Sequence, residues 1–287
     1  MTTLKKLKEI LEKENYSNPQ LAFYKLNVLK FVDEKKKGNE EKIKIEIDKK
    51  EFLEQFLRNL DYKALEESRK RFEKNIDKIY DSFDKKEKLR AKVGYRFVAG
   101  MGYPSVIENG FLFHFIYGVP YIPGETVKGL TRATFIYNCF SEKEESELKE
   151  IIRVLEEGKY KGEDEELQKE YEILFGTKEK EAKLIYLDAF PVSLEKEHFK
   201  VDIMNPHHSE YYSSRGEKPP VEWENPIPIF FLTLEDTEFC FRICLGDSFT
   251  EGKKYLEEAR ELLIKGLETF GIGGKRRKGY GWFVISS

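Results

Sequence analysis

The stretch LEEARELLIKGLETFGIGGKRRKGYGWFVI, residues 256–285, contains three of the elements on which the predicted fold depends. Its first half has apolar residues at helical spacing, namely Leu256, Ala259, Leu263, Leu267 and Phe270. A loop rich in glycine and cations follows, and residues 280–285 then read as a strand. The chain is therefore predicted to close with a helix, a glycine loop and a final strand.

The sequence before this stretch supplies the rest of the fold. Strand-like runs are expected at 95–98, 111–116 and 183–194, and a helix begins after a Pro-Gly turn, near Glu125. Residues 226–245 form two apolar runs around a turn-like Glu-Asp-Thr, which predicts a hairpin. The resulting order is strand, helix, strands, helix, strand. It predicts an α+β fold of the ferredoxin-like (RRM-like) β-α-β-β-α-β type with large helical insertions.

Two regions are expected along the chain. Residues 1–90 are interpreted as a mainly helical N-terminal region packed on the core, with a solvated charged loop at 34–42. A long helix in this region has an apolar stripe, formed by Leu65, Phe72, Ile76, Ile79 and Phe83. Residues 91–287 are interpreted as the ferredoxin-like domain, interrupted by an acid-leaning helical insertion at about 141–183.

Composition limits the classes of function. The chain has 287 residues, of which 36% are charged, and its net charge is only −3. A nucleic-acid site must therefore be a local basic patch. No apolar run approaches the ~20 residues of a membrane span, so no membrane partner is expected. The three cysteines lack metal-ligand spacing, which favours a reducing cytoplasm and neither metal nor cofactor.

The glycine loop is the leading candidate for a binding site. Glycine allows positive φ and close backbone approach to a ligand, and neighbouring cations suit phosphate. A nearby aromatic ring could stack on a base. The predicted RNA-binding residues here are Gly271, Gly273, Gly274, Lys275, Arg276, Arg277, Lys278 and Tyr280, with Lys128 and Arg132 on one face of the earlier helix. The alternative is a surface turn whose cations only keep it soluble.

A second candidate lies in the long polar loop at 202–226. Its RNA-contact candidates are His207, His208, Tyr211 and Tyr212. Metal binding or acid–base chemistry with Asp202 and Glu210 is an alternative, but adjacent histidines do not share a face of regular structure and no third ligand has clear spacing. Local packing of the loop is the other alternative. His114 and Asp188 are interpreted as structural, with Asp188 a hydrogen-bonding cap at a strand end.

Several segments together resemble a known family. They are GYPSVIENGFLFHFIYGVPYIPGETVKGLTRATF, DAFPV, DIMNPHHSEYY, NPIPIFFL and GIGGKRRKGYGWF, between residues 102 and 283. Their combination resembles the repeat-associated (RAMP) proteins of CRISPR systems, and among these the sixth subunits of type III-B (Cmr) effector complexes. The chain departs from the family pattern after GIG, where Gly274 and four cations stand in place of a small residue and neutral positions.

This resemblance implies a RAMP fold and a non-catalytic role in antiviral defence. It implies that the chain holds the guide (crRNA) RNA toward its 3′ end, beside other RAMP and small helical subunits and possibly the target RNA. An alternative within the same superfamily is an endoribonuclease that processes CRISPR precursor RNA by metal-independent acid–base chemistry. The segment DIMNPHH, at 202–208, favours the first function.

Overall fold

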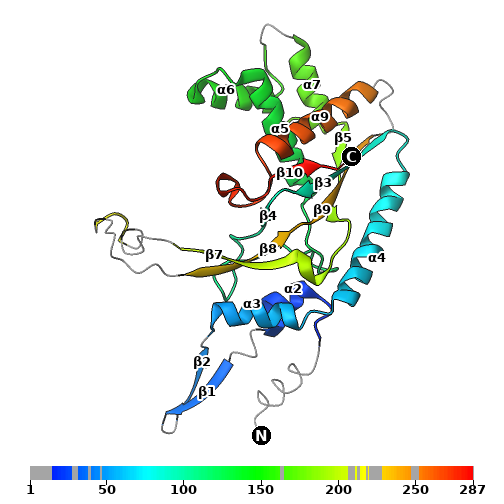
Figure 1. Ribbon diagram of the computed structural model, residues 1–287. Coiled ribbons are helices and arrows are strands. Elements are labelled where there is room, and N and C mark those ends of the chain that lie inside the picture. The colour runs from blue at the N-terminus through cyan, green and yellow to red at the C-terminus, as the bar shows by residue number, and fades with distance from the viewer. Residues whose placement is uncertain are drawn as a thin grey trace.

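The computed structural model describes residues 15–27, 32–37, 40–45, 47–161, 165–205, 211, 214–217, 219, 228–246 and 252–286. Its strands pair in antiparallel fashion and are combined with long helices, so the fold class is α+β (Figure 1). The named elements lie in two main sheets, a separate pair of strands, and helices packed around them.

The central sheet has the order β10-β3-β9-β5, and β6 also pairs with β9. Its strands are β3 (Lys86–Val93), β5 (Leu184–Tyr186), β6 (Phe190–Pro191), β9 (Glu238–Leu245) and β10 (Phe283–Ile285). In this register Leu89 lies opposite Phe241, and Phe283 lies opposite Val93. Strand β9 is buried along nearly its whole length, because both faces of the sheet are covered.

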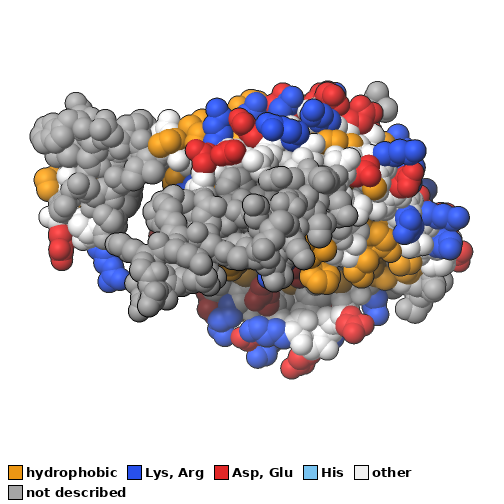
Figure 2. Space-filling view, turned by 90° about the horizontal axis from the view of Figure 1, so that it is seen from below, with side chains coloured by type: hydrophobic (Ala, Val, Ile, Leu, Met, Phe, Trp, Pro, Cys, Tyr) orange, Lys and Arg blue, Asp and Glu red, His pale blue; other side chains and the backbone are white. Residues whose placement is uncertain are grey.

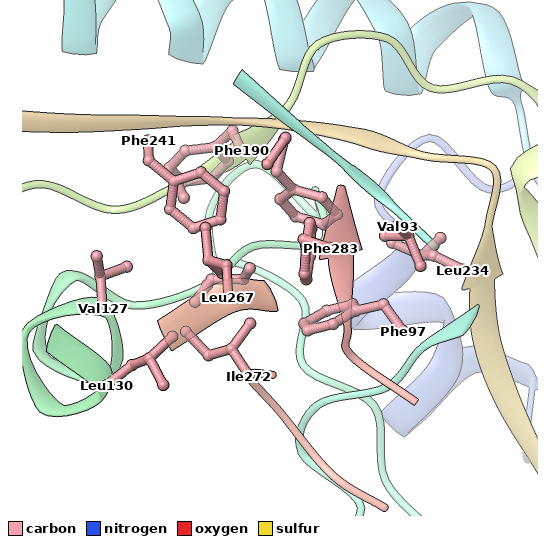
Figure 3. Close-up of a cluster of buried hydrophobic side chains, with 14 of the residues drawn as sticks. Val93, Phe97, Val127, Leu130, Phe190, Leu234, Phe241, Leu267, Ile272 and Phe283 are labelled. Carbon is pink, nitrogen blue, oxygen red and sulfur yellow. The ribbon is translucent and has the colours of Figure 1, made fainter. Parts of the chain in front are cut away.

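Helices α5 (Gly124–Phe140) and α9 (Lys253–Thr269) pack against each other on one face of this sheet. Figure 3 shows Leu130 of α5 and Leu267 of α9 in the cluster that also holds Phe241 and Phe283. Ile272, three residues beyond the end of α9, enters the same cluster. The glycine loop is therefore anchored to the core at its beginning.

Helix α4 (Tyr62–Asp81) lies on the opposite side of the sheet (Figure 1). Its inner face is formed by Leu65, Arg69, Phe72, Ile76 and Tyr80. Ile79, which was expected in the apolar stripe, is 52% exposed instead. Buried Arg242 from β9 reaches α4 and pairs with Asp77, because alternate residues of a strand point to opposite faces.

A second sheet has the order β4-β8-β7. Its strands are β4 (Arg96–Phe97), β7 (Phe199–Met204) and β8 (Ile229–Glu235). The hairpin predicted for 226–245 is wrong in its pairing: β8 belongs to this sheet, whereas β9 pairs in the central sheet. Strands β8 and β9 both have apolar residues at consecutive positions, and each is buried on both faces. Each strand therefore pairs within a different sheet.

The N-terminal region contains α2 (Pro19–Leu21), a π-helical turn η1 (Ala22–Leu26) and α3 (Lys49–Arg58), which contacts β7 and β8. The prediction of a charged loop at 34–42 is wrong, because most of this segment belongs to two strands. These strands, β1 (Val32–Lys37) and β2 (Glu40–Ile45), form an antiparallel pair. The alternation of Lys and Ile in KIKI, at 42–45, is a strand pattern. The boundary expected at 90/91 falls inside β3.

The insertion after α5 consists of α6 (Glu145–Glu156) and α7 (Glu165–Phe175) (Figure 1). The strand expected at 111–116 is reduced to an isolated bridge between Phe113 and Pro120. A turn interrupts it, in which Gly118 has a φ of 66° and donates to the carbonyl of His114. Pro120 has no amide hydrogen with which to extend a ladder.

Positive and negative side chains are interspersed on the described part of the face in Figure 2, in keeping with the small net charge. Within the described ranges, no helix combines the length and apolarity that crossing a membrane requires.

Candidate nucleic-acid interface

The glycine loop is held in place by contacts with its own chain. The φ angles of Gly271, Gly273 and Gly281 are 67°, 95° and 71°. A Cβ added to Gly271 would lie 2.7 Å from the carbonyl oxygen of Gly281. A Cβ added to Gly281 would lie 1.9 Å from the carbonyl oxygen of Ile272. These two glycines are therefore required by the fold of the loop itself, whatever the loop binds.

Gly274 and Gly279 differ from these positions. At Gly274 a Cβ would meet only ordinary contacts, the nearest being 3.5 Å away at Val98, and its φ is not in the left-handed region. At Gly279 a Cβ would have no neighbour within 4 Å, although the φ there is 89°. Backbone open to a ligand is thus found at these two glycines, on either side of the cations.

Three of the four loop cations lie at the surface. Arg276, Arg277 and Lys278 form the short helix η4 (Arg276–Lys278), and all three are exposed. Within the described part of the chain none of them pairs with a carboxylate. Lys275 is half-buried, with its Nζ 5.3 Å from the centre of the Phe231 ring. Burial, together with the charge of Lys278, lowers the pKa of Lys275.

Tyr280 is part of a polar network beneath the loop. Its hydroxyl donates to Oδ2 of Asp202 at 2.6 Å, and Arg96 donates to the same oxygen at 2.5 Å and to Glu235 at 2.6 Å. Burial opposes ionisation of Asp202, but these donors outweigh it and lower the pKa of the carboxyl. Tyr280 is only 8% exposed. This hydrogen bond holds the loop against β7, and little of the Tyr280 side chain lies at the surface.

Lys128 and Arg132 are neighbours on α5, as their spacing predicts, yet they line different cavities. Arg132 donates to Glu156 of α6 at 2.8 Å. Lys128 has no acidic partner in the described residues, and burial together with Arg132 lowers its pKa. Arg132 shares its cavity with Arg276. The structure thus brings one of these two side chains to the glycine loop.

Of the four RNA-contact candidates in the loop at 202–226, the structure describes one. His207, His208 and Tyr212 lie outside the described residues. Tyr211 is described, and its carbonyl accepts a hydrogen bond from Gly216 at 2.9 Å. In the part of the chain that the structure describes, no three His, Cys, Asp or Glu side chains gather as a metal site would require.

The two residues interpreted as structural are both satisfied within the fold. Asp188 accepts a hydrogen bond from Gly124 at 2.7 Å, at the start of α5, which confirms it as a cap. His114 accepts from two backbone amides through Nδ1, and its ring packs against Phe72 and Tyr121. Burial lowers the pKa of His114 and favours its neutral form.

Sequence reasoning missed an apolar groove beside the loop. Tyr137 of α5 and Phe270, at the end of α9, line it together with Arg276. Tyr137 is 48% exposed, and its ring centre lies 5.1 Å from that of Phe270. No local pattern predicts this meeting, because 133 positions separate the two aromatic residues along the chain.

Comparisons with known proteins give relatives of one kind. The chain is 33% identical over 233 residues to the CRISPR system Cmr subunit Cmr6 of Pyrococcus furiosus; the match covers 67% of this chain and 66% of that protein, just under two thirds of its length. It is 24% identical over 283 residues to the Cmr6 subunit of Saccharolobus solfataricus, covering 96% of this chain and 83% of that protein.

Two solved structures are also similar. The crystal structure of Cmr6 from Pyrococcus furiosus has a TM-score of 0.48 at 31% identity and covers 71% of this chain and 98% of that chain. A chain in the cryo-EM structure of the type III-B Cmr-beta bound to cognate target RNA has a TM-score of 0.57 at 21% identity, covering 83% and 71%. The second likeness concerns the fold alone.

The model of the RAMP superfamily matches residues 97–284, which is more than half of the chain. This match begins at the end of β4 and spans both helices that pack on the central sheet, the insertion and the glycine loop. The chain therefore belongs to the RAMP superfamily, and its curated relatives are Cmr6 subunits of CRISPR systems.

Proposed function

We propose that the chain is a non-catalytic RNA-binding and assembly subunit of a type III-B (Cmr) CRISPR effector, and that it binds the guide RNA toward its 3′ end. Its similarity to proteins named Cmr6, and to a chain of a Cmr complex bound to target RNA, supports the assembly. Its partners are then guide RNA, target RNA, and the other RAMP and small helical subunits of that complex.

The observation that carries RNA binding is the presentation of the loop cations. Arg276, Arg277 and Lys278 are exposed and lack acidic partners within the described ranges, although the chain as a whole is slightly acidic. In contrast, many other surface cations are paired, such as Arg153 with Glu150 and Glu157. A loop that presents three neighbouring cations at the surface, without acidic partners in the described residues, suits a phosphate backbone.

We further propose that the central sheet and its helices form a ferredoxin-like unit. In chain order its parts are β3, α5, β5, β9, α9 and β10, which is the β-α-β-β-α-β sequence of elements. The antiparallel order β10-β3-β9-β5 and the packing of α5 and α9 on one face support this assignment. Helices α6 and α7 are then an insertion, whose charged surface is available to neighbouring subunits.

The absence of catalysis is part of the same proposal. Asp188 is engaged as a helix cap, His114 is packed among aromatic rings, and Asp202 is paired with Arg96 and Tyr280. None of these groups is arranged as a free acid–base pair with an orienting partner. Incubation with precursor repeat RNA, with and without chelator, is expected to leave the RNA intact. Specific cleavage that Asp188→Ala or His207→Ala abolishes would support the endoribonuclease alternative instead.

RNA binding is tested with the triple variant Arg276→Ala/Arg277→Ala/Lys278→Ala. The slope of log affinity against log salt is expected to flatten by roughly 0.7 for each phosphate that the variant no longer neutralises, equally for unrelated single strands. The matched control is Arg71→Ala/Lys74→Ala/Lys78→Ala, which removes three exposed cations from α4 that also lack acidic partners in the described residues. An unchanged slope in the loop variant would reduce the loop to a solubility turn.

The position on the guide requires the assembled complex. A guide RNA with a photoreactive base at its 3′ end is expected to cross-link to this chain, and the triple variant is expected to lose that product. Cross-linking from the 5′ end alone would contradict the proposed position.

A further inference from the structure

An apolar groove opens between α5, α6 and the end of α9, directly beside the glycine loop. It encloses about 460 Å³. Its apolar lining is formed by Ile136, Tyr137, Phe140, Leu148, Ile152 and Phe270. Figure 1 shows the glycine loop, in red, leaving α9 near α5 and α6. The groove therefore continues from the surface proposed to bind phosphate.

The aromatic rings of Tyr137 and Phe270 are only partly covered by the rest of the protein. Tyr137 is 48% exposed, and Phe270 meets it edge-on, with ring planes at 79°. Lys265 lies over the Tyr137 ring at 6.0 Å from its centre, and donates to Asn138 at 2.6 Å. An exposed aromatic ring in an apolar groove gives a surface on which a flat group can stack.

The groove rim is cationic, and its charges are not equivalent. Arg132 is paired with Glu156, and Lys143 is paired with Glu147. Arg276 has no acidic partner among the described residues. It also belongs to the glycine loop, so it is the cation that links the two surfaces. A ligand that places an anion at Arg276 places the group attached to that anion at the groove.

We propose that this groove receives an unstacked base of the RNA whose phosphate is bound by Arg276. The inference rests on the proposed function and deepens it. A nucleotide joins an anion to a flat aromatic group, which matches a free cation beside an apolar groove with an exposed tyrosine. Among the residues that line the groove, only Tyr137 and Ser141 carry a side-chain hydroxyl, so few neutral polar groups are available to a base edge. Base binding is therefore expected to tolerate any base, because stacking needs no base-edge hydrogen bonds.

The test compares two strands of equal length and charge, oligouridine and an abasic ribose-phosphate oligomer. The wild-type protein is expected to bind oligouridine more tightly. Tyr137→Ala is expected to weaken oligouridine binding by about 5- to 150-fold, without weakening the abasic strand. Tyr137→Phe should retain the preference, and Arg276→Ala should weaken both strands. A strand containing 2-aminopurine should change its fluorescence with the wild-type protein, and less so with Tyr137→Ala.

The control is Tyr103→Ala, since Tyr103 is 52% exposed and does not line the groove. Equal loss with this variant would overturn the groove proposal. If both strands bind with a normal salt slope and Tyr137→Ala changes neither affinity, only the groove proposal fails. If neither strand binds in a salt-dependent way, the proposed RNA binding itself fails. If Tyr137→Ala spares RNA binding but prevents co-purification with other Cmr subunits, the groove is a protein-docking surface and the proposal is wrong.

Discussion

A Cβ atom at Gly273 would lie 2.5 Å from the carbonyl oxygen of Val98, and the amide of Gly274 donates to that same oxygen at 2.7 Å. The loop is therefore pinned to the chain immediately after β4. The contact with Val98 gives different roles to two glycines that are adjacent in sequence. Gly273 is needed by the fold, whereas Gly274 has room for a side chain.

We expect Gly273→Ala to destabilise the protein by about 1–3 kcal/mol, because its φ of 95° is strained for alanine and the clash is with backbone. Gly274→Ala should change the free energy of unfolding by less than about 0.5 kcal/mol, as a surface substitution does. Urea denaturation measures both values. Equal losses would contradict the distinction. If RNA approaches the backbone at Gly274, its alanine variant should bind RNA more weakly while remaining fully stable.

The network beneath the loop predicts a dependence on pH. The folded-state pKa of Asp202 is lowered, so its contribution to stability is present above the unfolded pKa of about 3.9 and is lost as pH falls through the folded value. Asp202→Asn should cost about 1.5–3 kcal/mol at pH 7, since hydrogen bonds from Arg96 and Tyr280 to a charged acceptor are weakened.

The measurement is the difference in unfolding free energy between wild type and Asp202→Asn at a series of pH values. It should be constant between about pH 6 and 8 and shrink below about pH 4. Tyr280→Phe, which keeps the carboxylate, should retain part of the pH dependence. A difference that stays the same down to pH 3 would show that ionised Asp202 does not stabilise the fold.

A second titration, with the opposite sign, is expected between α7 and α9. Burial, and a hydrogen bond with Glu170, raise the pKa of Glu258 to about 8. A folded pKa above the unfolded value of about 4.3 gives stability that is complete below that value and is lost as pH rises through about 8. Glu258→Gln should remove this loss, because a neutral side chain keeps its hydrogen bond to Glu170.

Thermal unfolding between pH 5 and pH 9 checks this expectation. The variant should be relatively more stable than the wild type at pH 9 and similar at pH 5. Glu268→Gln is the control, since Glu268 is exposed on the same helix. If both variants follow the wild-type curve, Glu258 does not titrate in this range.

Removing one partner of the ion pair between α4 and β9 is expected to lower the free energy of unfolding strongly. Arg242 is 1% exposed, and its Nε donates to Oδ1 of Asp77 at 2.9 Å. Its Nη2 lies 2.8 Å from the same oxygen, at an angle outside hydrogen-bond geometry, so this second contact is ionic. Asp77→Ala should destabilise by about 3–5 kcal/mol, because it leaves a buried guanidinium without its main partner.

Replacing both partners, as in Asp77→Ala/Arg242→Met, should recover much of that loss. The matched control is Asp81→Ala on the same helix, whose partner Lys86 is at the surface, and its cost should be about 0–1 kcal/mol. Chemical denaturation of the four proteins gives these values. A cost for Asp77→Ala no larger than that of the control would show that the buried arginine finds other partners, such as Glu73.

The sequence by itself determined the last elements of the RAMP domain, which are helix α9, the glycine loop and strand β10. Helix α9 follows its apolar spacing: Leu256, Ala259, Leu263 and Leu267 are buried, whereas Phe270, the fifth residue of the predicted pattern, lies just beyond the helix and is only partly buried. The glycines of the terminal loop marked positive φ, which Gly271, Gly273, Gly279 and Gly281 adopt. These features depend on interactions within a few residues, so a local pattern is sufficient to predict them. The family motifs likewise lie in contiguous segments.

Only the tertiary structure decided which surfaces those elements share. It placed β8 and β9 in different sheets, brought Arg96, Asp202 and Tyr280 together, and joined Tyr137 to Arg276 around one groove. These partners are far apart along the chain, and their pairing depends on burial and charge balance over the whole core. The same packing explains why Gly273 is not open to a ligand in the way that Gly274 is. The carbonyl oxygen of Val98 occupies the space beside Gly273, and no local sequence pattern predicts that neighbour.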